Sequence, residues 1–294
     1  MQFHEYGADQ KQTILLLHGG GLSWWNYREA AELLQGDYHV ILPILDGHAG
    51  SDRPFTTIED NAAELIRFVD EHLGGSVLLI GGLSLGGQVL LEILSQRRNI
   101  CSYALIESAA VIPSKLTNAL IAPAFGTSFG LIRNRSFAKM QFQSLHIKPE
   151  LFEDYYRDTC LIEKQDMIAF MAANTSYALK NSFRNTAAKV HVCVGEKETG
   201  EILRSADAIC RALPSARLHR LPGLRHGEFS INHADRYADA VRQIVLTRVT
   251  REEMRKETSQ MLFPCRKHLQ YRGLGEGNGA ENARETMELK DALP

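Results

Sequence analysis

One stretch in the first third of the chain limits the fold more than any other. The apolar run Leu78–Ile80 leads into two glycines, a serine, a leucine and two further glycines, and helix-like residues follow to Leu94. The centre of the pattern is Gly82-x-Ser84-x-Gly86, in which a buried strand turns sharply into a helix. Glycines at the turn let strand and helix approach without a side-chain clash. The pattern predicts that Ser84 is an exposed nucleophile, with a helix-capping serine as the alternative.

Strand-like and helix-like segments alternate on both sides of this stretch. Helical periodicity follows most strand candidates, for example over residues 56–73, 202–213 and 233–245. This alternation predicts an α/β fold with a mostly parallel, doubly wound sheet. The strand candidates are mostly continuous apolar runs, as expected for strands buried on both faces, and they comprise residues 13–17, 38–43, 77–80, 103–106, 190–194 and 216–221, with 3–6 as a short edge strand.

Two changes of character divide the chain. Between residues 113 and 186 helical segments follow one another without strand-like alternation, which predicts a helical cap inserted into a core made of residues 1–112 and 187–247. Residues 248–294 are densely charged, poor in apolar side chains and interrupted by closely spaced glycines. This composition predicts a largely disordered C-terminal extension. An extension without a function of its own is preferred to a regulatory or targeting tail.

Composition excludes several classes of protein. The 294 residues carry 33 basic and 35 acidic side chains, a net charge of -2, which gives no reason to expect a nucleic-acid partner. No apolar run reaches membrane-spanning length, and the first residues lack the basic and apolar regions of a signal peptide. The five cysteines are scattered and without C-x-x-C spacing, so we expect reduced thiols and a cytoplasmic location.

A serine nucleophile needs a base and an acid that orients the base. His226 lies in a glycine-flanked loop after the last predicted strand, and it is a better candidate base than His219, within a strand, or His233, at a helix start. The loop after strand 190–194 supplies Glu198 as the preferred acid. Such loops leave the carboxyl ends of parallel strands, where distant residues converge. The alternative acids are Glu107, which ends strand 103–106, and then Glu196 and Glu201.

Several loop motifs occur together. They are His18-Gly19-Gly20, Asp46-Gly47-His48-x-Gly50-Ser51, Gly82-x-Ser84-x-Gly86-Gly87, Gly195-Glu196-Lys197-Glu198 and Pro222-Gly223-x-x-His226. With these motifs, residues 12–247 resemble the α/β-hydrolase superfamily of small serine hydrolases with a helical lid. The resemblance implies the α/β-hydrolase fold and a triad of Ser84, His226 and Glu198. The family most often has aspartate where this chain has Glu198, and some of its lipases take their acid from the position of Glu107.

An oxyanion hole is implied as well, because a tetrahedral intermediate needs prearranged donors. The N–H of Leu85 is one expected donor, and the N–H of Gly20, with Gly21 as the alternative, is the other. Asp46, His48 and Ser51 are interpreted as groups that lock their loop, in preference to a metal site at Asp46 and His48. The expected pocket residues are Gly21, Trp24, Trp25, Phe125 and Phe129, although single aromatic residues belong more often to a core.

The expected function follows from the serine at the elbow. Haloalkane dehalogenases and epoxide hydrolases of this superfamily have aspartate there. The resemblance therefore implies hydrolysis of a small ester or related acyl compound through an acyl-Ser84 intermediate, without a cofactor or metal. A non-catalytic binder of small ligands and an acyltransferase stay open as alternatives, as does a homodimer.

Overall fold

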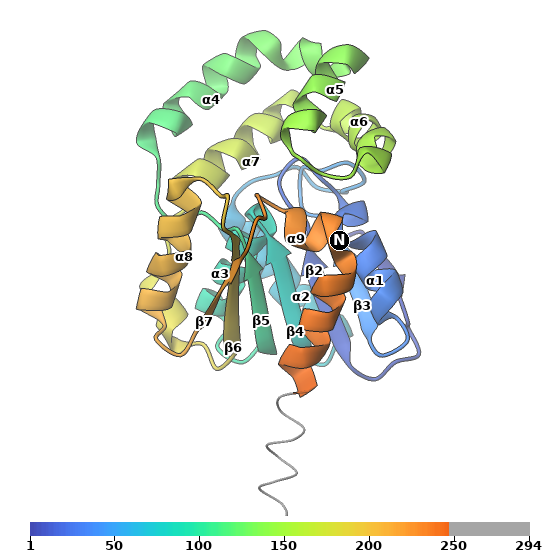
Figure 1. Ribbon diagram of the computed structural model, residues 1–294, viewed down its shortest axis with the longest axis vertical. Coiled ribbons are helices and arrows are strands. Elements are labelled where there is room, and N and C mark those ends of the chain that lie inside the picture. Colours follow the sequence, from blue (N-terminus) through green and yellow to red (C-terminus); the bar gives the residue numbers. More distant parts are fainter. Residues whose placement is uncertain (247–294) are drawn as a thin grey trace, which may run out of the picture. The chain divides into compact units, whose positions relative to one another are not determined.

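The computed structural model describes residues 1–246 (Figure 1), so the predicted extension over residues 248–294 lies outside the described part. A seven-stranded sheet has the order β1-β3-β2-β4-β5-β6-β7, and every neighbouring pair is parallel except β1 with β3. This confirms the predicted fold class. The strands are β1 (Phe3–Tyr6), β2 (Thr13–Leu17), β3 (His39–Pro43), β4 (Val77–Leu83), β5 (Cys101–Glu107), β6 (Lys189–Gly195) and β7 (Arg217–Leu221).

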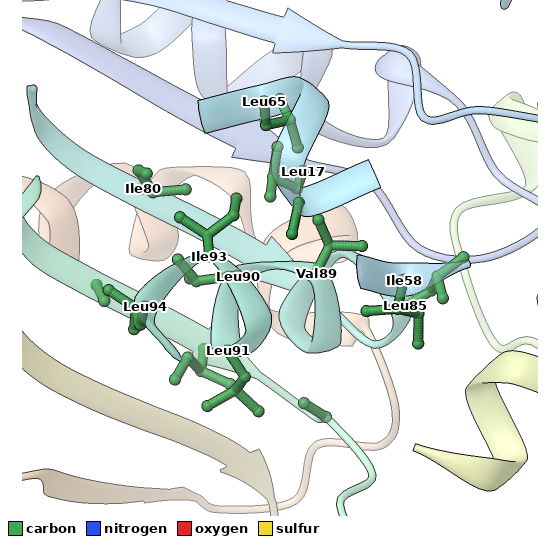
Figure 2. Close-up of a cluster of buried hydrophobic side chains, with 14 of the residues drawn as sticks. Leu17, Ile58, Leu65, Ile80, Leu85, Val89, Leu90, Leu91, Ile93 and Leu94 are labelled. Carbon is green, nitrogen blue, oxygen red and sulfur yellow. The ribbon is translucent and has the colours of Figure 1, made fainter. Parts of the chain in front are cut away.

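Helices cover both faces of the sheet, so alternate strand residues enter two different cores. Leu15 and Leu17 of β2 pack with helices α2, α3 and α8, whereas Ile14 and Leu16 pack with α1 and the helical residues 234–246. Figure 2 shows part of the first core, in which side chains of α3 meet Leu17, Leu65 and Ile80. The helices that cover the two faces include η1 (Trp24–Tyr27), α1 (Arg28–Leu34), α2 (Ile58–His72), α3 (Leu85–Gln96), α8 (Gly200–Ala212) and α9 (Glu228–Asn232).

The chain between β5 and β6 contains only helices and irregular segments. Figure 1 shows α4 to α7 gathered beyond one end of the sheet, and we call residues 113–186 the cap. Within residues 1–246 no helix is long and apolar enough to cross a bilayer. The cap elements are α4 (Lys115–Ser128), η2 (Phe129–Arg133), α5 (Arg135–Ser144), η3 (Pro149–Leu151), α6 (Phe152–Leu161), α7 (Lys164–Ser176) and η4 (Asn181–Asn185).

The start of α2 differs by one residue from the expected position. The sequence suggests a capping box of Thr56 and Glu59, but the N-cap is Thr57, whose side-chain oxygen accepts the N–H of Asp60 at 3.0 Å. Thr57 has extended backbone angles, which a capping residue needs. Because Thr56 and Thr57 are adjacent, the sequence allows the helix to begin after either of them. In the structure it begins after Thr57, and its first residue, Ile58, is buried.

The turn from β4 into α3 is as tight as the glycine pattern predicts. Ser84 has φ 53° and ψ -111°, a left-handed conformation that non-glycine residues rarely adopt. A Cβ at Gly82 would lie 2.4 Å from the carbonyl oxygen of Gly86, and a Cβ at Gly86 would lie 2.2 Å from that of Leu17. Both approaches are to backbone atoms, so the glycines are required by the path of the chain.

Replacing Gly86 by alanine is therefore expected to lower the free energy of unfolding by about 3 kcal/mol or more, at the upper end of overpacking costs. The added methyl group displaces the end of β2, where the carbonyl of Leu17 lies. Urea unfolding of the variant and wild type measures the difference. Gly36→Ala is the matched control, because a Cβ there meets nothing within 4 Å. Equal destabilisation by the two substitutions would contradict the clash.

Candidate active site

The four neighbouring parallel strands β4 to β7 bring the predicted catalytic loops together. The register pairs Leu83 of β4 with Glu107 of β5, and Glu107 with Cys193 of β6. The N–H of Ser84 donates to the carbonyl oxygen of Glu107 at 2.8 Å, which ties the elbow to the end of β5. Since β4 to β7 are parallel, the loops after β4, β6 and β7 leave the sheet at the same edge.

His226 and Glu198 are joined directly. Nδ1 of His226 lies 3.0 Å from Oε2 of Glu198, and the Glu198 side chain is 1% exposed whereas that of His226 is 46% exposed. The other carboxylate oxygen, Oε1, accepts a short hydrogen bond from the hydroxyl of Ser108. Ser108 has φ 55°, a second left-handed residue at this edge of the sheet. Both oxygens of Glu198 are thus occupied, which fixes the orientation of its carboxylate.

This environment changes the basicity of His226. Burial by itself lowers the pKa of His226, but the hydrogen bond that His226 donates to Glu198 and the negative charges of Glu198 and Glu107 outweigh it, so the pKa lies above its ordinary 6.5. In the neutral ring the hydrogen bond at Nδ1 keeps the proton on that nitrogen and leaves Nε2 as an acceptor. An imidazole held in this way suits a general base.

The competing acids lie elsewhere. Glu107 is buried, its Oε1 accepts the N–H of Ser230 at 3.3 Å, and burial raises its pKa to about 7. Glu196 accepts the N–H of Gly223 at 3.0 Å, and Glu201 lies in the first turn of α8. Among the candidate acids of the described chain, Glu198 alone makes a hydrogen bond to His226.

The loop after β2 lies against the elbow. A Cβ at Gly20 would lie 3.5 Å from Cβ of Leu85, so the two predicted oxyanion donors come from neighbouring backbone. The N–H of Gly21 is already used, because it donates to Nε2 of His48 at 3.1 Å. Leu85 is the first residue of α3, where N–H groups lack a partner within the helix. This geometry favours Gly20 over Gly21 as the second donor.

Two buried histidines hold that loop. Nε2 of His18 accepts the N–H of Leu45 at 3.1 Å, while Nδ1 of His48 lies 3.0 Å from the carbonyl oxygen of Asp46. Burial lowers the pKa of His18 to about 3 and that of His48 to about 4, so both rings are neutral near pH 7. The loop-locking interpretation of His48 agrees with these contacts. Within residues 1–246 no three potential metal-ligating side chains come together.

A cavity of about 590 Å³ lies between these loops and the cap, and Ser84, Glu198 and His226 line it together with Gly20 and Gly21. The side chains of Ser84 and His226 are not hydrogen-bonded to each other among the described contacts. Hydrogen bonds of this kind often tighten only when substrate is bound.

The predicted aromatic pocket residues divide into two groups. Phe125 lines the cavity. Trp25 does not: it is 1% exposed within the core, and its Nε1–H donates to Oδ2 of Asp158 at 2.8 Å. Phe129 packs against the core, and Trp24 stacks on His4 with ring centres 3.7 Å apart. The expectation for Trp24, Trp25 and Phe129 is corrected accordingly.

Helix α7 supplies much of the cavity wall, which the sequence analysis did not anticipate. Met167, Phe170, Met171 and Asn174 all line the cavity. Their spacing of three, four and seven residues places them on one helix face, so helical periodicity could have identified them as a group. Phe170 also stacks on His48, with ring centres 4.4 Å apart.

The sheet order and the strained serine turn after β4 are those of the α/β-hydrolase fold. A family model described as the Alpha/beta hydrolase family matches residues 14–240, and the chain belongs to that family. Two curated relatives match over about a third of their length. The hydrolase YugF of Bacillus subtilis is 28% identical over 102 residues, covering 34% of this chain and 37% of the relative. A soluble epoxide hydrolase of Corynebacterium is 28% identical over 100 residues, covering 34% and 35%.

Solved structures share the fold at low sequence identity. An enol-lactonase from Burkholderia xenovorans has a TM-score of 0.71 at 16% identity, over 84% of this chain and 96% of the other. An esterase from Exiguobacterium antarcticum has a TM-score of 0.70 at 17% identity, over 83% and 94%. A thermophilic esterase from Thermogutta terrifontis, solved with malate, has a TM-score of 0.69 at 19% identity, over 84% and 93%.

Proposed function

We propose that this protein is a serine hydrolase that cleaves a small ester or related acyl compound, with Ser84, His226 and Glu198 as its catalytic triad. One observation carries the proposal. A serine held in a strained turn and a histidine bonded to a buried carboxylate line the same cavity. Residues in these roles can activate a hydroxyl that is otherwise a poor nucleophile at neutral pH.

In the proposed reaction Nε2 of His226 accepts the Ser84 proton as the serine oxygen attacks the substrate carbonyl. The oxyanion receives hydrogen bonds from the N–H groups of Gly20 and Leu85, and each such donor is worth about 3 kcal/mol. The intermediate then expels the alcohol, which takes the proton from His226. Water attacks the acyl-Ser84 ester in the same manner and releases the acid. Glu198 keeps the imidazole oriented and stabilises its charged form.

The cavity supports a small substrate with an apolar part. Its volume of about 590 Å³ and its lining by Phe125, Ile132, Met167 and Phe170 suit a short acyl or alcohol group. Two structural neighbours are described as esterases and one as an enol-lactonase, so esters and lactones are the first compounds to examine. The curated epoxide hydrolase is a less suitable guide, because epoxide hydrolases of the superfamily have aspartate at the position of Ser84.

A second candidate is a protein that binds a small ligand in this cavity without turnover. The observation that favours it is the lack of a hydrogen bond between the described side chains of Ser84 and His226. Tight binding of a carboxylate or lactone by a wild-type protein that never reacts with a fluorophosphonate would support this candidate.

Acyl transfer to an alcohol is separated from hydrolysis by product analysis with a competing nucleophile.

The test is hydrolysis of short-chain p-nitrophenyl esters as a function of pH. Because the neutral imidazole is the base, kcat/KM is expected to fall tenfold per pH unit below the pKa of His226 and to level off above it. Glu198 and Glu107 raise that pKa, so the midpoint is expected above 6.5. The chemical hydrolysis of each ester without enzyme is the blank. No turnover of any ester or lactone, or a profile without this rise, would argue against the proposal.

A further inference from the structure

The outer face of α4 is an exposed apolar stripe. Leu116 is 76% exposed and Leu120 is 58% exposed, and Leu131 in the following η2 is 50% exposed. The spacing of three and four residues places the exposed positions on one helix face. We call this set the outer stripe of α4, and its members are Leu116, Ala119, Leu120, Pro123, Ala124 and Thr127, all of them exposed. Such a run is unusual on a surface that only meets water.

The opposite face holds α4 in place. Nδ2 of Asn118 donates to the carbonyl oxygen of Ala172 in α7 at 2.7 Å, and Ile121 is buried. Phe125, on the same face, lines the cavity. The helix therefore cannot bury its outer stripe by rolling without losing these contacts. Figure 1 shows α4 on the side of the cap that is remote from the sheet, so neither the sheet nor the core helices cover it.

The chain segment that carries the stripe has charges of one sign only. From Ser108 to Pro149 the chain contains no aspartate or glutamate, while Lys115 precedes the stripe and Arg133 and Lys139 follow it. Within the described chain none of these three cations pairs with a carboxylate. The other two cations of this segment are paired, Arg135 with Glu153 and Lys148 with Glu29.

The acidic groups of the cap lie on other elements. They are Glu150 of η3, Glu153, Asp154 and Asp158 of α6, and Glu163 and Asp166 at the start of α7. Asp154 and Asp158 bind Arg157, and Asp166 accepts the N–H of Phe55. The outer stripe thus meets solvent as an apolar surface, and the chain segment that carries it has cations but no acidic side chain.

We propose that the outer stripe of α4 is a docking surface for an anionic phospholipid bilayer, on which the protein lies peripherally. A helix with an apolar face and flanking cations lies in the plane of the bilayer interface, where apolar burial and attraction to anionic headgroups add together. The 14 residues of α4 span about 21 Å, enough to place several side chains in the interface at once. A bilayer is favoured as the occupant because anionic headgroups would supply the negative charge that Lys115, Arg133 and Lys139 lack within their own segment.

Sedimentation with lipid vesicles tests the proposal with the full-length protein. We expect binding to vesicles of phosphatidylcholine mixed with phosphatidylglycerol, weaker binding to phosphatidylcholine alone, and a decrease as salt is raised. Leu116→Asp with Leu120→Asp is expected to reduce the affinity roughly tenfold or more. Replacing Lys115, Arg133 and Lys139 by glutamine is expected to reduce it about fivefold per cation.

The matched control is Leu33→Asp with Leu246→Asp, which changes two exposed leucines of the core helices by the same chemistry. It is expected to bind the mixed vesicles like wild type. Thermal unfolding of every variant shows whether it is folded. Wild-type protein that stays in the supernatant with the mixed vesicles would overturn the proposal. The proposal would also be overturned if the protein formed a concentration-dependent dimer that the α4 substitutions abolish while vesicle binding stays unchanged. A second copy of the chain would then be the occupant of the outer stripe. The experiment measures vesicle binding, so its outcome does not depend on whether the protein hydrolyses esters.

Discussion

Ser84→Ala is expected to reduce kcat for ester hydrolysis by about 10⁴-fold to 10⁶-fold, because the residual rate then depends on the oxyanion donors and binding alone. The substitution removes the one hydroxyl that lies at the elbow and lines the cavity. The substrate can still bind, so KM should change far less than kcat. The same variant should lose labelling by a fluorophosphonate, which reacts only with an activated serine. Turnover with p-nitrophenyl esters and gel detection of the label measure both effects.

Ser95→Ala provides the control on the same helix. Ser95 lies near the other end of α3, and its hydroxyl donates to the carbonyl oxygen of Leu91 rather than lining the cavity. Activity and labelling should be those of wild type. Full labelling of the Ser84→Ala protein would remove Ser84 from the mechanism, and the cavity would then need another nucleophile.

Glu198→Gln is expected to lower kcat by about 10³-fold to 10⁴-fold, as the loss of an orienting carboxylate does in serine hydrolases. An amide can donate to Nδ1 of His226 and so favour the wrong tautomer. It also removes the negative charge that raises the pKa of His226, so the midpoint of the pH profile should move down. The pH dependence of kcat/KM distinguishes this result from a purely structural loss, which would reduce the rate without moving the midpoint.

Glu107→Gln is the matched variant, since it makes the same chemical change in the competing acid. Glu107 bonds to the N–H of Ser230 rather than to His226, so the effect on kcat should stay below about tenfold, the size of an indirect electrostatic change. The pKa of Glu107, about 7, also means that the wild-type side chain is partly neutral near pH 7. If Glu107→Gln were the more damaging of the two, Glu107 would be the triad acid.

Most of the sheet was predictable because the central parallel strands are buried on both faces and therefore appear as mostly apolar runs. Strand β7 is the exception, because it is partly exposed and carries two arginines and a histidine. The 13–17 run shows this directly, with its residues alternating between two cores. The elbow was predictable because its glycines meet backbone atoms at distances that no side chain permits. The register and the order of the strands depend on contacts between distant segments, and the sequence alone defines those only through the resemblance to a family.

The pocket was harder to predict for a physical reason. Trp25 and Phe125 are both aromatic, but the indole of Trp25 is buried against Asp158 whereas Phe125 lines the cavity. The direction of a side chain depends on which helix packs against it, and the composition of the sequence does not predict that packing. The partnership of Ser108 with Glu198 joins residues 90 positions apart, and no local motif marks it.

That partnership bears on why a glutamate, and not the shorter aspartate, stands at position 198. The carboxylate reaches across from β6 to a hydroxyl at the end of β5 while it also holds the imidazole. Shortening the side chain by one methylene, as in Glu198→Asp, is expected to weaken one of the two contacts, because the carboxylate would then have to reach both neighbours from farther away.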